Sequence, residues 1–484
     1  MQYDVVIIGS GLAGSTLACH LPSHFKIAII EKGDFEYSKK INTNDYGNLS
    51  NESFGNFPAN NYSLNFTNIK QLGGNNKFWS GWSIPMQENE LKNWPITIDE
   101  MKKYYKFTEE YFKFLPFKDF ENLKEYSSFS NEDWNIKFWQ FGNKKIDIKK
   151  NLKSKKNIEI FTKSEFKEII LVEDKVKKIS FINNGEIKEI SCKSIVIAQG
   201  GLESTKTLLK TKFYLGKQLG NENGHLGKFY MEHPHITLGH FFDNNNLVKN
   251  LFVKKNNYKA GFFLKNNYIN NIINGLVTID NHDLHSRPDV YKLLFIARLL
   301  RVPRDLFKKR PFTSIVSDLS KATMQLILSK IKKKKFIVGI FEQKPNINST
   351  IKLSGNDKII LNWQISDDDI NSIINITNKF KDYIKTNISH DVYIDNKIYN
   401  TKNWFENYKD RVLGIGHHMG TTMMSSDKKK GVVDKNLKLH HINNLYICSS
   451  SVFPTGGVAH PTFTVCALAI RLAHHLEKNL NLNL

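Results

Sequence analysis

The order of apolar and polar residues at the start of the chain is typical of a buried parallel strand. The run from Asp4 to Gly9, DVVIIG, is almost continuously apolar, as in a strand covered on both faces. Leucine and alanine then recur at helical spacing until Pro22, and the residues from Phe25 to Gly33 form a second apolar run. This segment predicts a β-α-β unit of about thirty residues.

An alternating pattern appears further along the chain. Between Asp34 and about Lys156 the pattern is mixed, apart from one expected helix in TIDEMKKYYKFTEEYFKFL. Several stretches of alternating apolar and polar residues follow, and they end in the apolar run Ser194 to Gly201, SIVIAQGG. We expect a hairpin or three-stranded layer that returns to the parallel sheet.

The rest of the chain divides into a region without β-α-β rhythm and a glycine-rich end with a closing helix in PTFTVCALAIRLAHHLEKNL. The pattern predicts an α/β protein (α+β overall) with a discontinuous Rossmann-type nucleotide-binding domain. We place its two parts at residues 1–229, with an insertion at about 36–156, and at residues 401–484. A second domain, built on a mainly antiparallel sheet, takes residues 230–400.

Charge narrows the range of partners. Lysine and arginine exceed aspartate and glutamate by 69 to 47, a formal charge of +22, which suits an anionic partner. The lysines are spread over the whole chain without a nucleic-acid-binding motif, so we expect no nucleic-acid partner. Residues 291–335 contain two basic amphipathic helices, VYKLLFIARLLRVPRDLFKKR and KATMQLILSKIKKKK, which would suit peripheral contact with anionic lipid at a membrane.

The spacing of the cysteines and the length of the apolar runs indicate the cellular compartment of the protein. Cys19, Cys192, Cys448 and Cys466 show neither metal-binding nor redox spacing, so we expect no metal site and a reducing compartment. A strand begins almost at the first residue and leaves no room for a signal peptide. No apolar run reaches the ~18 to 20 residues that span a bilayer. The sequence therefore predicts a cytoplasmic protein.

The hexamer Gly9 to Gly14, GSGLAG, matches the dinucleotide-binding fingerprint G-x-G-x-x-G. The first glycine permits a tight turn, the second lets a pyrophosphate approach the backbone, and the third lets helix and strand pack closely. Glu31 ends the second strand twenty residues after Gly11, where a carboxylate accepts hydrogen bonds from a ribose 2′-hydroxyl. The fingerprint alone leaves FAD and NAD open, whereas the later return strand favours FAD.

The C-terminal stretch NNLYICSSSVFPTGGVAHPTFTVCALAIRLAHHL resembles the terminal signature of the glucose–methanol–choline (GMC) family of FAD-dependent oxidoreductases. Four further segments resemble motifs of this family: QLGGNNKFWSGWSIPM, VIAQGGLESTKTLL, HLGKFYMEHPH and GHHMGTTMM. A sixth, FEQKPNINSTIKLS, is similar to a motif of members related to fructose dehydrogenase and pyranose oxidase. The resemblance spans residues 3–477 and is weakest in the second domain.

The resemblance implies an oxidoreductase that acts on the CH–OH group of donors. In this family a hydride passes from an alcohol carbon to flavin N5 while a base, often histidine, takes the hydroxyl proton. The motif H-x-x-G-T maps the base onto His417, and the residue before P-T in the terminal motif maps its hydrogen-bond partner onto His460. Two roles for His418 stay open: a hydrogen bond within the flavin domain, or a contact with the substrate.

The resemblance also implies a set of FAD-contacting residues. They lie in the fingerprint, the flavin-covering loop, the return strands and the C-terminal segment: Gly9, Gly11, Leu12, Ala13, Gly14, Glu31, Gly73, Gly74, Asn75, Trp79, Phe166, Ala198, Gly200, Ser449, Ser450 and Thr462. Pyranose oxidase attaches its flavin through a histidine at the position of Phe78, so we expect noncovalent FAD here. Ser449 stands where the family commonly has an acidic residue, which weakens a polar contact to the flavin there.

Two other functions stay open. A flavin monooxygenase or an NAD(P)H-dependent reductase would need a second nucleotide site, and the chain shows only one convincing glycine fingerprint. A noncatalytic, membrane-associated nucleotide-binding protein would use the basic helices in residues 291–335. The sequence identifies neither the small-molecule substrate, an alcohol or a sugar, nor the electron acceptor, which could be oxygen, a quinone or another carrier.

Overall fold

The computed structural model of the protein describes residues 2–38, 40–42, 68–77, 79, 81–120, 124–141, 146–211, 218–248, 251, 258–265, 273–280, 333–355, 357–401, 404 and 412–482. The basic helices expected in residues 291–335 lie almost wholly outside the described residues, and so does position 78.

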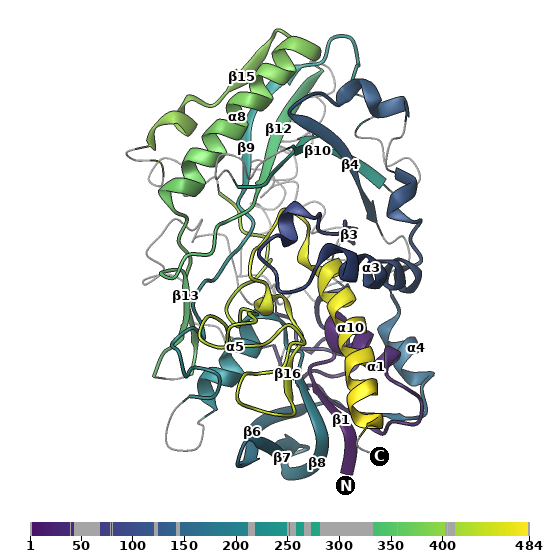
Figure 1. Ribbon diagram of the computed structural model, residues 1–484. Helices are drawn as coiled ribbons and strands as arrows, with labels where there is room; N and C mark the ends of the chain where they lie inside the picture. Colours follow the sequence, from purple (N-terminus) through teal and green to yellow (C-terminus); the bar gives the residue numbers. More distant parts are fainter. Residues whose placement is uncertain are drawn as a thin grey trace.

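A parallel sheet forms the core of the lower half of the molecule (Figure 1). Its strands are β1 (Gln2–Ile8), β2 (Ile27–Ile30), β5 (Ile158–Phe161), β8 (Glu186–Ile197) and β16 (Leu445–Ile447). The order is β5-β2-β1-β8, with β16 beside β8, and every one of these pairs runs parallel. β2 is buried over its whole length, which agrees with its continuous apolar run.

An antiparallel layer continues from the first half of β8. The strands β6 (Ser164–Val172) and β7 (Lys175–Asn183) form a hairpin, and β7 pairs with residues 186–191 of β8. The second half of β8 then lies between β1 and β16 in the parallel sheet. This confirms the expected three-stranded layer that returns to the parallel sheet.

A second, antiparallel sheet forms the upper half of the molecule (Figure 1). In the order β15-β9-β12-β11-β10-β4-β3, its strands are β15 (Val392–Ile394), β9 (His235–Phe242), β12 (Lys334–Phe341), β11 (Gly275–Asp280), β10 (Tyr258–Leu264), β4 (Trp134–Phe141) and β3 (Trp82–Ser83). A two-stranded sheet, β13 (Thr350–Leu353) with β14 (Ile359–Asn362), stands apart. The predicted fold class, a Rossmann-type unit with a mainly antiparallel second sheet, is confirmed.

Strands β3 and β4 belong to the second sheet although their residues fall within the insertion that we assigned to the nucleotide-binding domain. The reason is visible in the alternation along β4. Trp134 and Phe138 lie in the core beneath the second sheet, whereas Trp139 lies in the core of the parallel sheet. The insertion therefore links the two cores.

Helices cover both sheets. They are α1 (Leu12–His20), α3 (Ile98–Phe112), α4 (Ile148–Lys153), α5 (Gly200–Lys210), α8 (Asp367–Asn387) and α10 (Pro461–Asn481). Short 3-10 turns lie at Gly74–Lys77, Asn89–Leu91, Phe117–Phe120, Lys124–Phe129, Asn396–Tyr399 and Ser450–Val452. Thr16 Oγ1 lies 3.6 Å from Cys466 Sγ, which joins α1 to the closing helix α10.

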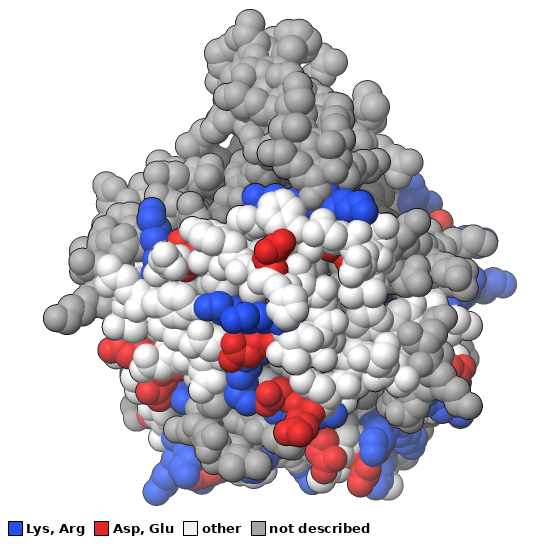
Figure 2. Space-filling model, turned by 90° about the horizontal axis from the view of Figure 1, so that it is seen from above, with Lys and Arg blue, Asp and Glu red and all other residues white. Residues whose placement is uncertain are grey.

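Both chain ends lie at the bottom of Figure 1, and α10 descends from the middle of the molecule to the C-terminus. Because β1 and β2 run parallel, α1 must descend as well, so the N-termini of α1 and α10 both point toward the junction of the two halves. Seen from above, lysines lie among acidic residues on the described part of the surface (Figure 2). Among the described helices, none is long and apolar enough to cross a membrane.

Ile376 on α8 tests how the second sheet is held. Its side chain is fully buried against β11, where a Cβ on Gly275 would come within 2.7 Å of Ile376 Cδ1. Ile376→Ala should lower the free energy of unfolding by about 2–5 kcal/mol because it leaves a cavity. Ile187→Ala is the matched control, since 73% of Ile187 is exposed, and its effect should stay within about 0.5 kcal/mol. Urea denaturation followed by tryptophan fluorescence would show equal midpoints if the contact were unimportant.

Candidate active site

The fingerprint glycines make a tight crossing of β1, α1 and the end of β8. Gly9 has a φ of +99°, and an added Cβ would lie 2.6 Å from the carbonyl oxygen of Ala198. A Cβ on Gly14 would lie 2.1 Å from the carbonyl oxygen of Gly9 and 3.2 Å from Ala198 Cβ. Gly9, Gly14 and Ala198 therefore lie together, and no larger side chain fits at the two glycines.

Gly11 differs from these glycines because the space beside it is open. Within the described residues, and apart from its chain neighbours, no heavy atom lies within 4 Å of a Cβ built there. Gly11 is the N-cap of α1, whose first turn begins with Leu12 and Ala13 and contains no acidic residue. The first N–H groups of this helix and its positive dipole end favour an anion, so these residues fit the pyrophosphate of a dinucleotide.

Glu31 follows β2 and turns its carboxyl group toward the fingerprint. Its Oε2 accepts hydrogen bonds from Ser10 N at 3.0 Å and Ser10 Oγ at 2.6 Å, and its Oε1 accepts from Gly33 N at 2.7 Å. Burial raises the pKa of this carboxyl, and the hydrogen bonds oppose that shift. A carboxylate has about four acceptor positions, so about one stays available to a ribose hydroxyl.

The glycine loop at residues 71–77, which is expected to cover the flavin, packs directly on the fingerprint. Gly73 N donates a hydrogen bond to Ser10 Oγ at 3.0 Å. A Cβ on Gly74 would lie 3.3 Å from Gly11 Cα, so the two glycine segments approach each other closely. The loop and the fingerprint therefore form one continuous glycine-lined surface.

Three more of the expected cofactor residues are Asn75, Trp79 and Phe166, and each has a different local contact. Asn75 Oδ1 accepts a hydrogen bond from Ile69 N at 2.9 Å, which shapes the loop. The ring of Trp79 lies edge-on to Phe112 of α3, with centroids 5.8 Å apart. Phe166 lies on β6, two residues after the point where the chain passes Glu31.

The remaining expected cofactor residues lie at the start of α5, after β16 and at the start of α10. Gly200 begins α5 with a φ of +80°, and within the described chain no heavy atom beyond its neighbours lies within 4 Å of a Cβ built there. Ser449 caps the turn after β16, and Ser450 Oγ donates to the carbonyl oxygen of His418 at 2.5 Å. Thr462 is half-buried in the first turn of α10.

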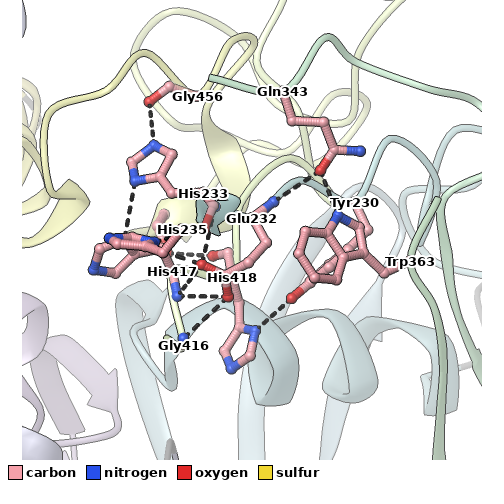
Figure 3. Close-up of polar contacts among 11 residues, drawn as sticks. Tyr230, Glu232, His233, His235, Gln343, Trp363, Gly416, His417, His418 and Gly456 are labelled. Carbon is pink, nitrogen blue, oxygen red and sulfur yellow. Dashed lines mark hydrogen bonds and ion pairs between the residues drawn. The ribbon is translucent and has the colours of Figure 1, made fainter. Parts of the chain in front are cut away.

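Four histidines from three segments form a cluster between the two sheets, and part of it is visible in Figure 3. The ring centroids of His417 and His460 are 4.7 Å apart, and those of His233 and His417 are 4.9 Å apart. His235 lies 6.1 Å from His417 and 6.4 Å from His460 between centroids. The two histidines that the sequence motifs single out thus meet from distant parts of the chain.

Two backbone bridges hold this arrangement. Met231 and Met419 exchange hydrogen bonds of 3.0 Å, and His235 and Leu413 exchange bonds of 3.0 and 2.9 Å. The segment that leads into β9 is thereby paired with the segment that carries the H-x-x-G-T motif. Histidines on the two segments lie side by side between the bridges.

Burial keeps three of the four histidines, His233, His417 and His460, neutral. It lowers the pKa of His233 to about 4, and it lowers the pKa of His417 and His460 well below the usual 6.5, with the neighbouring imidazoles adding to the shift of these two. The side chain of His417 keeps 13% of its surface exposed. His460 Nδ1 is buried and, within the described residues, has no hydrogen-bond partner. These three histidines therefore offer neutral imidazoles, and His460 offers a ring nitrogen without a partner among the described residues.

Glu232 holds the backbone that carries His417 (Figure 3). Its carboxyl oxygens accept hydrogen bonds from Gly416 N at 3.0 Å and from His417 N at 2.8 and 2.9 Å. Oε1 also accepts from His233 N at 3.0 Å. The backbone N–H of Glu232 in turn donates to Gln343 Oε1 at 3.2 Å. This buried carboxyl group therefore fixes both segments of the histidine cluster.

Two more buried glutamates hold the loop that leads to α10. Gly457 N donates to Glu342 Oε1 at 3.0 Å. Val458 N and Ala459 N donate to Glu90 Oε1 at 2.5 and 3.2 Å. Burial raises the pKa of Glu342 to about 7, and nearby Glu90 adds to the rise. Three consecutive N–H groups are thus bound immediately before His460.

Aromatic rings from the second sheet surround His460. Trp82 of β3 stacks on His460 with centroids 5.7 Å apart, and Trp139 of β4 meets it edge-on at 6.2 Å. Lys259 Nζ lies 5.1 Å from the Trp82 ring centroid on the same sheet. The insertion strands therefore form one side of the histidine cluster.

His418 has a hydrogen bond of its own away from the cluster (Figure 3). Its Nδ1 lies 2.8 Å from Tyr230 Oη, and burial lowers its pKa to about 3. Tyr230 is the first residue of the range assigned to the second domain, so this bond does not lie within the predicted flavin domain, and the role of His418 stays a prediction.

Sequence reasoning missed Glu232, His233, Glu342 and Glu90. The first two lie in HLGKFYMEHPH and the third in FEQKPNINSTIKLS, so both motifs contained a signal to which no role was given. Glu90 lies in no motif, and only the fold shows its role.

Comparisons with known proteins bear on the family and the fold of the chain. The GMC oxidoreductase family model matches residues 345–469. An uncharacterised protein of Methanocaldococcus jannaschii is 27% identical over 282 residues, which are 56% of this chain and 67% of that protein. A dehydrogenase of Armillaria gallica is 40% identical over 75 residues, only 15% of this chain and 12% of that one.

Solved structures share the fold along the whole chain. An FAD-dependent oxidoreductase from Chaetomium thermophilum has a TM-score of 0.62 at 13% identity, over 99% of this chain and 100% of that chain. Pyridoxine 4-oxidase from Mesorbium loti has 0.61 at 12%, over 98% and 99%. Formate oxidase from Aspergillus oryzae has 0.60 at 14%, over 99% and 98%. Residues 345–469 thus resemble the GMC oxidoreductase family, and the chain as a whole shares the fold of these three enzymes.

Proposed function

We propose that the protein oxidises the CH–OH group of a small alcohol, polyol or sugar, with His417 as the base and His460 as its hydrogen-bond partner. The match of residues 345–469 to the GMC oxidoreductase family model supports flavin-dependent oxidoreductase chemistry. The observation that carries the proposal is the meeting of two neutral histidines, with centroids 4.7 Å apart, where α10 begins.

FAD is the cofactor, and when bound it supplies the atom that accepts the hydride. Gly11 and the first turn of α1 would hold its pyrophosphate, and Glu31 would accept from its ribose. The first turn of α10 contains no acidic residue, so its helix dipole would stabilise negative charge on the flavin ring.

His417 takes the hydroxyl proton in this proposal. An alcohol is a very weak acid, so a base must accept its proton as the hydride leaves. His417 Nδ1 faces His233 at 2.9 Å, which leaves Nε2 as the nitrogen for the substrate. The Glu232 carboxyl lies 4.0 Å from Nδ1 and would stabilise the imidazolium that forms.

His460 would orient the substrate oxygen through a hydrogen bond. Trp82 and Trp139 lie against its ring on two sides and restrict its motion and its contact with water. Its Nδ1 has no partner in the described part of the chain and could bind a hydroxyl group. The Pro461 that follows it starts α10, so the side chain is also fixed through the backbone.

Substrate and acceptor need direct tests. Among the structures with this fold, one oxidase is named for formate and another for pyridoxine, so the fold serves more than one donor. We propose an alcohol or sugar because a base and a hydrogen-bond donor suit removal of a hydroxyl proton. Oxygen, a quinone or another carrier would reoxidise the flavin.

Substitutions at two fingerprint glycines distinguish an effect on folding from an effect on cofactor binding. Gly11→Ala should fold normally, because its Cβ meets open space, but should weaken FAD binding at least tenfold, about 1.4 kcal/mol. Gly14→Ala should instead destabilise the fold, because its Cβ would clash with the Gly9 carbonyl. Fluorescence titration with FAD and thermal unfolding of the apoprotein measure the two effects. Parental FAD affinity in Gly11→Ala would contradict the assignment of the pyrophosphate site.

The flavin should leave the protein when it is denatured, because position 78 is phenylalanine and offers no nucleophile for covalent attachment. Acid precipitation should therefore give a yellow supernatant and a colourless pellet. A yellow pellet would show a covalent bond at another residue.

The two histidines should be needed for flavin reduction but not for flavin binding. His417→Ala and His460→Ala should retain FAD and lose reduction by roughly 10²–10⁴-fold, the range of general base catalysis. Anaerobic bleaching of the flavin with a panel of sugars, polyols and alcohols measures this. His390→Ala, at an exposed histidine on the second domain, is the control. If both active-site variants reduced flavin at the parental rate, the assignment would be wrong.

A further inference from the structure

His233 connects the C-terminal loop to His417 through both of its ring nitrogens (Figure 3). Its Nε2 lies 3.3 Å from the carbonyl oxygen of Gly456, and its Nδ1 lies 2.9 Å from His417 Nδ1. The residue is fully buried. Water therefore has no access to replace either contact.

The first of these contacts defines where the hydrogen of His233 sits. A carbonyl oxygen only accepts, so Nε2 of His233 must carry the hydrogen in its bond to Gly456. Burial lowers the pKa of His233 to about 4, so its ring is neutral and its Nδ1 has a lone pair.

The second contact then defines the hydrogen of His417. With a lone pair on His233 Nδ1, the bond between the two Nδ1 atoms forms only if His417 Nδ1 donates. A neutral His417 that carries its hydrogen on Nδ1 has the lone pair on Nε2. Nε2 is the nitrogen that the proposed reaction requires as a proton acceptor.

The Glu232 carboxylate does not take over this bond. Glu232 Oε1 is 4.0 Å from His417 Nδ1, beyond hydrogen-bond distance, and its oxygens accept from backbone N–H groups. His235 Nδ1 contacts the carbonyl oxygen of His233 at 2.8 Å. The ring of His460 lies 4.7 Å from His417 between centroids.

We propose that His233 is a positioning residue that fixes His417 as the Nδ1–H tautomer and so keeps its Nε2 ready to accept a proton. The catalytic consequence rests on the proposed function. The tautomer itself is a property of the resting protein, so it can be tested without a substrate.

The test compares two replacements of His233. Asparagine can place its Oδ1 near the position of Nδ1 and keep an acceptor for His417. Glutamine can keep a donor toward Gly456 but has no acceptor at the Nδ1 position. The full-length, FAD-bound protein is labelled with ¹⁵N-histidine, and long-range ¹H–¹⁵N spectra report which ring nitrogens carry hydrogen. His417→Asn identifies the signals of His417, and His390→Gln is the control for a remote histidine.

We expect an unprotonated Nε2 and a protonated Nδ1 for His417 in the parent protein and in His233→Asn. In His233→Gln, the His417 signals should move toward the Nε2-protonated form, and flavin reduction by the best substrate of the panel should fall roughly 10- to 100-fold. His233→Asn should stay within a few-fold of the parent. FAD absorbance and circular dichroism show whether each variant is folded.

Two results would overturn the proposal: a protonated Nε2 on His417 in the parent protein, or an unchanged His417 tautomer in folded His233→Gln. The spectrum of the parent protein shows whether His417 Nε2 is protonated even if His233→Gln does not fold. Failure of the proposed function would give a different result. The flavin of His417→Ala would then be reduced at the parental rate, whichever tautomer His417 has in the parent protein.

Discussion

Buried glutamates that bind backbone N–H groups hold the active-site loops in place. Glu232 binds the segment that carries His417, while Glu342 and Glu90 bind the loop before His460. A buried carboxyl group is unfavourable unless it is hydrogen-bonded, and N–H groups of a non-helical loop are equally unfavourable when buried alone. Each therefore satisfies the other. Two loops without regular secondary structure are thereby held by hydrogen bonds at their N–H groups, which a site built from separate segments requires.

Local patterns of the sequence predicted the close packing of the fingerprint glycines and singled out His417 and His460, which the structure brings together, while their roles stay predictions. A glycine fingerprint depends on contacts within one β-α-β unit, and the tight approach of Gly9 and Gly14 is already implied by their spacing. His417 and His460 lie in motifs whose neighbours are close in sequence. The closing helix and the return strand also follow from apolar periodicity.

The rest depends on long-range pairing, which periodicity does not encode. Side chains of strand β4 point alternately into the two hydrophobic cores. Only the structure shows that β4 pairs with β10, more than a hundred residues later in the chain. Helix α8 was missed although Ser366 and Asp369 form a capping box and three aspartates open its first turn. His233 has no role until the bridges beside it pair its segment with that of His417.

The histidine cluster combines neutrality with a fixed direction for hydrogen bonds. Burial alone would leave each imidazole free to exchange tautomers, and a base whose lone pair points the wrong way cannot accept a proton from substrate. The Gly456 carbonyl removes this freedom because it can only accept a hydrogen bond. His233 Nε2 must therefore donate to Gly456, and His417 Nδ1 must donate to His233 Nδ1. That carbonyl belongs to the loop that Glu342 and Glu90 hold. The glutamates are thus connected to His417, the proposed base, through the backbone and His233.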